Sequence, residues 1–443
     1  MNPLSIFKHS FAHGVHPDEH SEQTAHLPIQ RVPFVNRYIL PLGQHLGAPA
    51  RPIVKVGQRV QRGELLAKPG AFVSTTLHSP VTGWIRAIEP RRHPGGKLQP
   101  ALEIEADPYA TQRLEAKPAI DWMTLSTEEF INHVQQAGIV GMGGAAFPSH
   151  VKYAVPDGIK IKHLVVNGAE CEPYLTNDHR LMLERPDTLL KGIEIVKQKL
   201  GATQATIGIE LNKADAIAIL QQRIKQQHLQ TTQVVPLRVK YPQGAEKMMI
   251  QALFGEEVPA GQLPRDVGVT VNNVGTLVAI ADYFEMGMPL IERIVTVSGP
   301  GIAQPANLIV PLGTPVREVL RFCGGLKETT QEVIMGGPMM GMPIASLDVP
   351  ILKGSSGVLA FTAQETRKLQ EYPCIRCGRC VEACPHFLNP SRLARLSKSG
   401  HYADMTAYNV MDCVECGACT FSCPSGIPIV QLIKVGKTEI RKK

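Results

Sequence analysis

The residues best able to do chemistry are cysteines near the carboxyl end of the chain. Eight of the ten cysteines lie within the last 70 residues, in two runs that share the spacing C-x2-C-x2-C-x3-C-P. The runs are Cys374, Cys377, Cys380 and Cys384, then Cys413, Cys416, Cys419 and Cys423. In this spacing three thiolates of a run bind one [4Fe–4S] cluster, and the fourth Cys ligates the other cluster. We therefore expect one cluster on Cys374, Cys377, Cys380 and Cys423, and a second on Cys413, Cys416, Cys419 and Cys384.

Zinc is the alternative metal, because four thiolates also hold Zn²⁺. Zinc sites usually pair two C-x2-4-C knuckles, whereas these runs are triplets with a fourth Cys before Pro, so the spacing favours iron–sulfur. Between the runs lie 28 residues. Asn389 as a cap, Pro390 as the first helical residue and Gly400 as a stop predict one helix there.

A second candidate site is the glycine-rich segment 138–148, which Lys152 follows. Glycine lets the backbone approach a phosphate closely, and a following helix start adds a positive dipole. The segment is not G-x-G-x-x-G after a strand, so it lacks the common dinucleotide fingerprint. By itself it is equally well explained as a tight turn.

Three further segments, taken together with this one, show a specific resemblance to a known family. "GMGGAAFPSHVK" (141–152), "NGAECEPYLTNDHRLM" (167–182), "YPQGAEK" (241–247) and "VNNVGTL" (271–277) occur in the same order as in the flavin subunit of respiratory NADH dehydrogenase. With "HLGAPARPIVKVGQRVQRGE" (45–64) and the eight cysteines, residues 30–435 or so resemble the C subunit of the Rnf complexes, which are ion-translocating ferredoxin:NAD⁺ oxidoreductases.

This resemblance implies FMN bound without a covalent link. The matched flavin positions are Gly141, Gly143 and Gly144 along the ribityl phosphate, Lys152 as a positive charge, Asn167 and Glu170 at the isoalloxazine, and Asn272, Asn273 and Thr276 at the phosphate end. Singly, each has a plainer explanation; Asn272 and Asn273 could form a turn, for example. One shared ligand explains them together.

The resemblance also implies NAD(H). Tyr241 and Gly244 would shape the nicotinamide side, Phe147 would stack on NADH, and Glu172 and Glu246 match acidic residues near the nucleotide, which makes them the catalytic candidates. Glu170 and Glu172, which flank Cys171, would place two carboxylates near the site; these would disfavour a 2′-phosphate and so favour NADH over NADPH.

The chain departs from the respiratory pattern at two positions that touch the nucleotide more than the flavin. Ala245 stands where the pattern has the first of two glutamates, and Val155 replaces an aromatic residue.

Hydride chemistry moves two electrons and iron–sulfur clusters move one, and a flavin converts between them. The expected function is electron exchange between NAD(H) and membrane partners through FMN and two clusters, reversed when ferredoxin is the donor. Three alternatives remain: a cobalamin reductase with the same motifs, an iron–sulfur relay without nucleotide activity, and a quinone-site relative of the sodium-pumping NADH:quinone reductase. The last lacks the eight cysteines.

Several modules must position these residues. A chain of 443 residues predicts three or four domains. Short strands between frequent turns predict a β domain first; apolar strands alternating with helices, such as His163 to Asn167, Ala205 to Glu210 and Val234 to Lys240, then predict an α/β layer. The fold class is multidomain α/β and α+β. We expect a 1–28 N-terminal arm, a 29–108 barrel-sandwich hybrid domain, a 115–290 Rossmann-like FMN/NADH-binding domain, a 291–365 β-grasp (soluble ligand-binding) domain and a 366–443 helical two-cluster ferredoxin domain.

The arm carries five histidines, His9, His13, His16, His20 and His26. A metal site is conceivable there, but Gly14 and Pro17 would break the helix it needs, so a polar arm lying over other domains is favoured.

Composition limits the class of partner. The content of 44% hydrophobic residues is that of a globular protein, and a net charge of +7 is too diffuse to indicate nucleic acid. No segment approaches the roughly 20 apolar residues of a membrane span, and Leu4 to Phe7 is too short for a signal-peptide core, so we expect a cytoplasmic protein.

The basic carboxyl terminus beside Ile429, Val430, Leu432 and Ile433 could lie on an anionic bilayer, although a frayed, solvated tail is favoured. The resemblance implies peripheral attachment to the cytoplasmic face of the inner membrane. The partners it implies are the other subunits of the complex, notably the ferredoxin-like B subunit, and ferredoxin indirectly.

Overall fold

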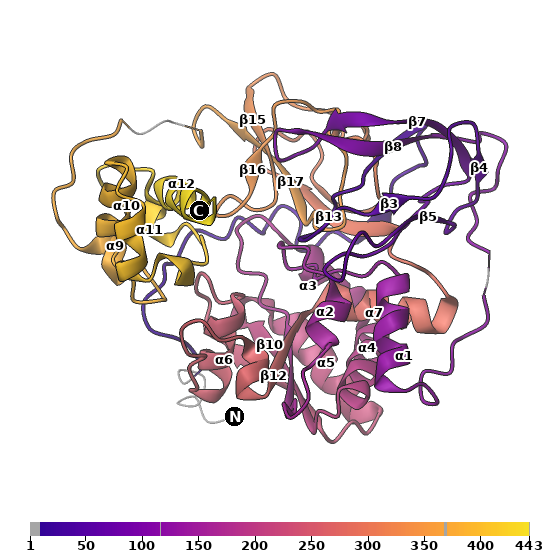
Figure 1. Cartoon of the computed structure of the whole chain (residues 1–443), viewed down its shortest axis with the longest axis horizontal. Helices are drawn as coiled ribbons and strands as arrows, with labels where there is room; N and C mark the ends of the chain where they lie inside the picture. The colour runs from indigo at the N-terminus through magenta and orange to yellow at the C-terminus, as the bar shows by residue number, and fades with distance from the viewer. Residues whose placement is uncertain (1–8, 116, 367–369, 443) are drawn as a thin grey trace.

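The computed structural model describes residues 9–115, 117–366 and 370–442. Leu4 to Phe7, considered above as a signal segment, lies outside these residues. Figure 1 shows an α/β domain at the bottom, two β-rich modules above it, and the cysteine module at the side.

The α/β domain is built on a parallel sheet of four strands in the order β11-β10-β9-β12. The strands are β9 (His163–Asn167), β10 (Gln204–Glu210), β11 (Thr232–Leu237) and β12 (Val269–Asn273). The α/β layer predicted from the alternation of strands and helices is therefore confirmed. The third predicted strand begins and ends earlier than expected, because the chain leaves the sheet after Leu237.

Seven helices pack around this sheet in the part of the chain described. They are α1 (Thr127–Gln136), α2 (Ser149–Tyr153), α3 (Asn177–Glu184), α4 (Pro186–Lys199), α5 (Ala214–Gln226), α6 (Glu246–Phe254) and α7 (Val274–Met286), with the short 3-10 turns η2 (Leu211–Lys213) and η3 (Pro264–Val267). Helix α4 crosses α7 at Gly192, where an added Cβ would lie 2.0 Å from the carbonyl oxygen of Leu277. Glycine is required there because the two backbones touch.

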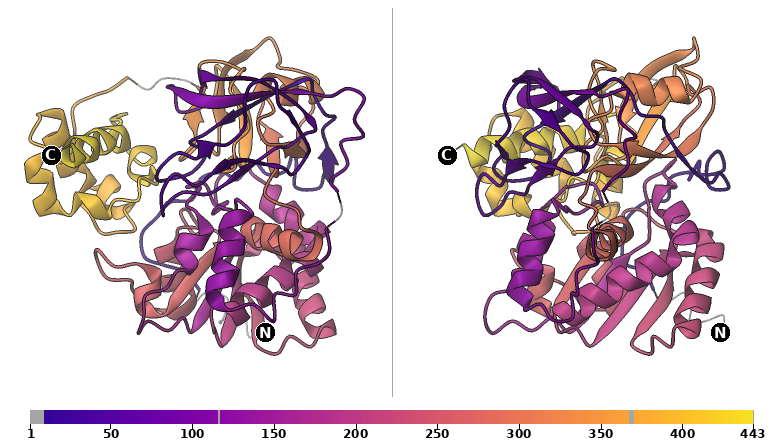
Figure 2. Two further views of the ribbon diagram at one scale, coloured as in Figure 1. Left: turned by 45° about the vertical axis from the view of Figure 1, so that its right-hand side comes forward. Right: turned by 90° about the vertical axis from the view of Figure 1, so that its right-hand side faces the viewer.

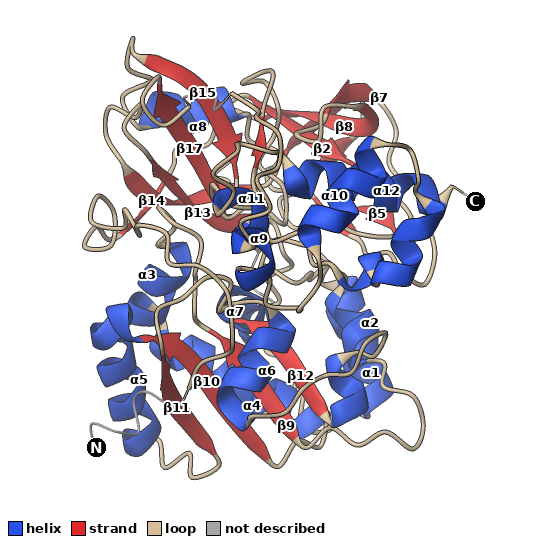
Figure 3. Cartoon of the chain, turned by 90° about the vertical axis from the view of Figure 1, so that its left-hand side faces the viewer, coloured by secondary structure: helices blue, strands red, loops and turns tan. Residues whose placement is uncertain are grey.

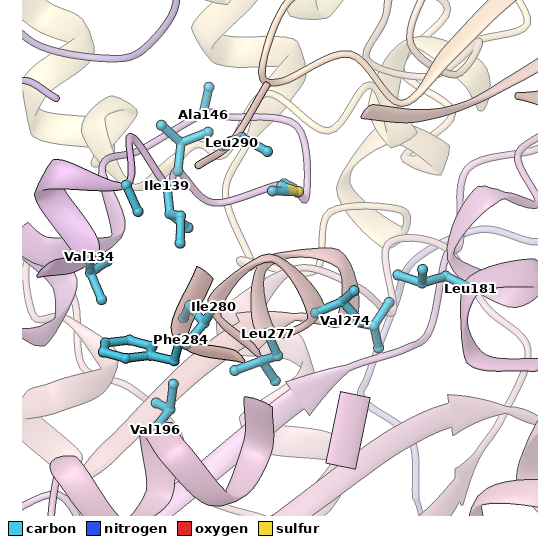
Figure 4. Packing of buried hydrophobic residues seen from close by; sticks show 14 of the residues in the cluster. Val134, Ile139, Ala146, Leu181, Val196, Val274, Leu277, Ile280, Phe284 and Leu290 are labelled. Carbon is cyan, nitrogen blue, oxygen red and sulfur yellow. The ribbon is translucent and has the colours of Figure 1, made fainter. Parts of the chain in front are cut away.

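The core of this domain is apolar and continuous with that of the first β module. Figure 4 shows Val134, Leu277, Ile280 and Phe284 converging between α1, α7 and the sheet. All four side chains are fully buried or nearly so. Burial at roughly 25 cal/mol per Å² of apolar surface makes such a core the main stabilising term.

The first β module has a four-stranded sheet, β2-β8-β7-β4, and a three-stranded sheet, β3-β5-β6. The strands are β2 (Arg37–Pro41), β3 (Arg51–Pro52), β4 (Arg59–Val60), β5 (Leu65–Lys68), β6 (Leu77–His78), β7 (Gly83–Arg92) and β8 (Leu98–Ala106). All its strand pairs are antiparallel. The two sheets are seen in the indigo part of Figure 2.

The second β module is a six-stranded mixed sheet, β1-β14-β13-β17-β15-β16, with helix α8 (Val316–Phe322). Its strands are β1 (Ile29–Arg31), β13 (Glu292–Ser298), β14 (Ala306–Pro311), β15 (Thr330–Met335), β16 (Met342–Pro343) and β17 (Gly357–Thr362). Strand β1 pairs in parallel with β14, so a segment from the start of the chain completes this sheet.

The cysteine module is helical (Figure 3). It contains α9 (Arg379–Glu382), α10 (Pro390–Lys398), α11 (Ala418–Phe421) and α12 (Ile429–Arg441), with the turns η4 (Ala403–Tyr408) and η5 (Val410–Asp412). The predicted helix is confirmed: the side chain of Asn389 accepts a hydrogen bond from the Arg392 N–H at 3.1 Å, and Pro390 is the first residue of α10.

Helix α12 corrects the expectation of a frayed or membrane-bound tail. Ile429, Val430 and Ile433 are buried in the core of the cysteine module, where α12 lies against α10. Lys437 is buried too, and its Nζ donates to the carboxylate of Glu415 at 2.6 Å. The apolar face is thus covered by the protein itself.

The N-terminal arm crosses three modules, as expected for a polar arm. Val15 and Tyr241 exchange backbone hydrogen bonds of 2.8 Å in both directions, and the Gly14 N–H donates to Ala383 O at 3.3 Å. Asn307 Nδ2 in turn donates to Thr24 O at 2.9 Å. Among the helices of the described ranges, none is both long and apolar enough to span a membrane.

Candidate flavin and iron–sulfur sites

The candidate flavin site lies at the carboxyl edge of the parallel sheet. The chain passes from β9 to β10 and β11 in one direction, and then places β12 on the opposite side of β9. The strand order therefore reverses between β9 and β12, where open α/β sheets bind their ligands. Asn167 ends β9, Asn273 ends β12, and the two are partners in the register.

The glycine-rich segment lies over this reversal point. Met142 N donates to the hydroxyl of Thr276 in the first turn of α7 at 3.0 Å. Gly143 faces Asn273, since an added Cβ would lie 3.8 Å from the Asn273 Cβ. Gly144 has a φ of +110° and open space where a side chain would be. Gly141 N donates to Phe147 O at 2.7 Å, so the segment folds back on itself and leaves Phe147 half-buried.

Lys152 is not a free positive charge in this structure. Its Nζ donates to Glu246 Oε1 at 2.5 Å and to Val271 O at 2.7 Å. The contact joins α2 to the start of α6 and to β12. Glu246, a catalytic candidate, has a side chain that is 44% exposed. Its carboxylate is engaged in the ion pair with Lys152.

Glu170 and Glu172 point to different neighbours. Glu170 accepts the backbone N–H groups of Asp178 at 2.7 Å and His179 at 3.0 Å, in the first turn of α3. Burial, and then the nearby carboxyl of Asp178, raise the pKa of Glu170. Glu172 accepts the N–H groups of Met339 at 3.0 Å and Met340 at 2.9 Å, and burial raises its pKa to about 7.

Tyr241 and Gly244 lie in the link between β11 and α6. The amide of Asn167 donates to Gly244 O at 2.8 Å, and Gly244 N donates to the thiol sulfur of Cys171 at 3.3 Å. Tyr241 is buried, and its hydroxyl donates to Cys416 O at 2.7 Å. Its ring therefore faces the cysteine module.

The acidic residues line a cavity that the glycine-rich segment does not reach. Glu170, Glu172 and Tyr241 line it together with Glu210 and Lys213, at the ends of β9, β10 and β11. Residues of the N-terminal arm also line the cavity: His16, Pro17, Glu19, Ser21 and Ala25. Gly141, Gly143, Gly144, Lys152, Asn272 and Asn273 do not line it. The predicted residues thus form two groups along one sheet edge.

Three buried polar side chains at this edge have atoms without a hydrogen-bond partner among the described residues. Both amide atoms of Gln243 are unpaired although the residue is 0% exposed, and Asn272 Nδ2 is unpaired as well. Arg293 Nη2 is also unpaired, while its Nη1 lies 2.5 Å from Met142 Sδ behind the glycine-rich segment.

Buried polar groups are normally paired, so these orphans fit a polar ligand such as the imide edge and phosphate of FMN. Sequence reasoning missed two of the three. Gln243 lies inside the quoted segment 241–247 and could have been noticed there. Arg293 lies outside every quoted segment.

Four cysteines from both runs line one cavity in the cysteine module, and we name it the inner cysteine cavity: Cys384, Cys413, Cys416 and Cys419. This is the ligand set predicted for the second cluster. Apolar Leu388, Val430 and Ile433 are also part of the wall, and Lys437 Nζ donates to Cys413 O at 2.8 Å. Four thiols in an apolar wall fit a [4Fe–4S] cluster.

The other four cysteines form the outer cysteine group: Cys374, Cys377, Cys380 and Cys423. Burial raises the pKa of Cys380, and the neighbouring Cys423 and Cys374 raise it further, which places these three together. Cys374 and Cys377 are exposed. Within residues 9–115, 117–366 and 370–442, no three His, Cys, Asp or Glu side chains are close enough together to ligate a single metal ion, a tighter arrangement than the thiolates around a four-iron cluster.

The comparisons with known families match these modules one by one. Residues 9–109 match the RnfC barrel sandwich hybrid domain, and residues 134–282 match the Nuo51 FMN-binding domain. Residues 294–343 match the SLBB domain, and residues 373–427 match the 4Fe-4S dicluster domain. Fold and site together define an oxidoreductase component in which an FMN domain is joined to an iron–sulfur domain.

Relatives that align over nearly the whole chain identify its family more specifically. The chain is 47% identical to the C subunit of the proton-translocating ferredoxin:NAD(+) oxidoreductase complex of Clostridium ljungdahlii, over 98% of this chain and 94% of that protein. It is 40% identical to the Na(+)-translocating counterpart of Acetobacterium woodii, over 99% and 98%. With the C subunit of the ion-translocating oxidoreductase complex of Pseudomonas aeruginosa it shares 43% identity over 98% of this chain but 56% of that protein. The chain belongs to the C-subunit family of the Rnf-type ion-translocating oxidoreductase complexes.

Solved structures support the fold alone. A chain of an NAD⁺-reducing [NiFe]-hydrogenase, crystallised in the H2-reduced state, aligns with a TM-score of 0.50 and 19% identity, over 72% of this chain and 65% of that one.

Proposed function

We propose that this chain is a peripheral electron-transfer subunit that exchanges electrons between NAD(H) and membrane-bound partners through FMN and two [4Fe–4S] clusters. The observation that carries the proposal is the placement of Asn167, Asn273 and the glycine-rich segment at the reversal of strand order. In this proposal the α/β domain is Rossmann-like, the second β module is a β-grasp fold, and the modules follow the domain limits given above.

The residues of this chain bind and orient the flavin. The backbone of Gly141, Gly143 and Gly144 approaches the phosphate end, where α7 begins and its dipole favours an anion. Asn167 and the orphaned amides of Gln243 and Asn272 supply donors and acceptors to the ring and ribityl groups. When bound, the flavin supplies the conversion between two-electron and one-electron transfer.

The proposal also assigns residues to the side of the site that binds the nucleotide. Glu172 holds the 336–341 loop, and Glu246 holds Lys152. Both therefore act by positioning the chain around the nucleotide. Phe147 is half-buried at the edge of the glycine-rich segment, where it can stack on a base.

The partners we propose are the other subunits of the complex, including its ferredoxin-like B subunit, with ferredoxin acting through them. The site of attachment is the cytoplasmic face of the inner membrane. The names of the relatives, which describe complexes that translocate protons or Na⁺, support this assignment.

The test is anaerobic purification followed by flavin extraction and NADH-driven reduction of the clusters. We expect about one FMN per chain and bleaching of both clusters by NADH. Asn167→Ala should weaken FMN binding, whereas Asn132→Ala, at an exposed position on α1, should leave it unchanged. A chain that binds no flavin but holds its clusters would be a bare relay, and cobalamin reduction at a comparable rate would favour a cobalamin reductase.

A further inference from the structure

The contact surface between the cysteine module and the rest of the molecule lies on one side of that module. Tyr241 from the α/β domain donates its hydroxyl hydrogen to Cys416 O at 2.7 Å. Cys171, Met339 and Cys416 pack against a small buried cluster formed by Val15, Tyr241, Ala383 and Ala418. Cys416 lines the inner cysteine cavity, so the α/β domain touches that cavity directly.

Two other segments hold the same side. An added Cβ at Gly417 would lie 2.8 Å from Met339 O, so the 336–341 loop presses on the residue after Cys416. Glu172 fixes that loop by accepting the N–H groups of Met339 and Met340. The arm fixes the other edge, because Gly14 N donates to Ala383 O, the residue before Cys384.

The outer cysteine group has the opposite character. Cys374 and Cys377 are exposed, and exposed Tyr372 and Ile375 stand beside them. Cys416, which lines the inner cysteine cavity, packs against Tyr241 of the α/β domain, whereas Cys374 and Cys377 of the outer group are exposed.

We infer that Tyr241 is a positioning residue that joins the α/β domain to the cluster of the inner cysteine cavity, and that this cluster exchanges electrons with the flavin. The inference rests on the proposed function. The hydroxyl hydrogen of Tyr241 holds the Cys416 carbonyl in place and polarises its peptide group, whose N–H belongs to the next residue, Gly417. Hydrogen bonds around the sulfurs tune cluster potentials, and a positive dipole end favours the reduced, more negative state.

The experiment is a redox titration of the cluster-loaded chain, monitored by electron paramagnetic resonance, with dithionite and mediators. Tyr241→Phe keeps the ring and removes the hydroxyl. One cluster should become harder to reduce by up to about tenfold in its equilibrium constant, which is ~59 mV for one electron, and the other should not move. Tyr408→Phe is the matched control within the cysteine module, because its hydroxyl makes no hydrogen bond to the described residues and its ring only lies under Arg392.

The order of the clusters is tested without touching Tyr241. In Cys416→Ala, dithionite should still reduce the outer cluster while NADH should not; in Cys377→Ala, NADH should still reduce the inner one. Unchanged potentials in Tyr241→Phe, equal shifts of both clusters, or NADH reduction of the outer cluster in Cys416→Ala would overturn the inference. Failure of the wild-type chain to bind flavin would instead refute the proposed function, and the dithionite titration would still report on Tyr241.

Discussion

Replacing Gln243 by leucine should change the flavin-free and flavin-bound protein in opposite directions. Gln243 is 0% exposed, and neither its Nε2 nor its Oε1 has a hydrogen-bond partner among the described residues. A buried polar group left unpaired costs about 1–3 kcal/mol. Leucine has a similar volume and no polar atom, so Gln243→Leu should raise the unfolding free energy of the flavin-free chain by ~1–3 kcal/mol.

The same change should weaken flavin binding. If the amide pairs with the ring, each lost hydrogen bond is worth about 0.5–1.5 kcal/mol, and two give a loss of roughly tenfold or more in affinity. Urea unfolding of the flavin-free chain and anaerobic titration with FMN, followed by flavin fluorescence, measure the two effects.

Gln251→Leu is the matched control, because Gln251 Oε1 on α6 is also buried and unpaired within the described part of the chain. It should stabilise the chain without changing FMN affinity. The reasoning fails if Gln243→Leu destabilises the flavin-free chain, since a water would then satisfy the amide, or if the affinity for FMN is unchanged.

Two further predictions concern the clusters and a buried lysine. Cys384→Ala should remove about four of roughly eight irons. Adding Cys413→Ala should then remove no more iron, whereas adding Cys374→Ala should remove the rest. The opposite pattern in iron analysis would mean that each run binds its own cluster. Burial lowers the pKa of Lys353 from 10.5 to about 7, while its Nζ donates to Thr76 O at 2.7 Å and Gly138 O at 2.6 Å. Between those pH values the unfolded chain holds a proton that the folded chain lacks, so the wild type should gain up to ~1.4 kcal/mol per pH unit relative to Lys353→Met as pH rises. Equal slopes of urea stability against pH for the two proteins would show that Lys353 titrates normally.

Local sequence patterns predict much of the secondary structure of this protein. The four α/β strands alternate with helices of regular apolar spacing, and β9 and β10 lie within one residue of the predicted limits. The cysteine spacing predicts the ligand sets of the clusters, because three cysteines of each run lie within seven residues, and the structure brings the four cysteines of one predicted set to a single cavity. Asn389 and Pro390 likewise mark a helix start by local hydrogen bonding and by a fixed φ.

Other features depend on residues far apart in the chain. Tyr241 and Cys416 are 175 residues apart, and Glu172 meets Met339 at a separation of 167. Residues 29–31 were assigned by the domain limits to the first β module, whereas they form β1, which pairs with β14 of the second.

A hydrogen bond between distant segments leaves no periodicity, because its geometry is set by how modules pack after each has folded. The sequence alone therefore determined which cofactors this chain is built for. Only the tertiary structure decided which cysteines lie against the α/β domain and which carboxylates are already engaged, since both depend on packing between modules.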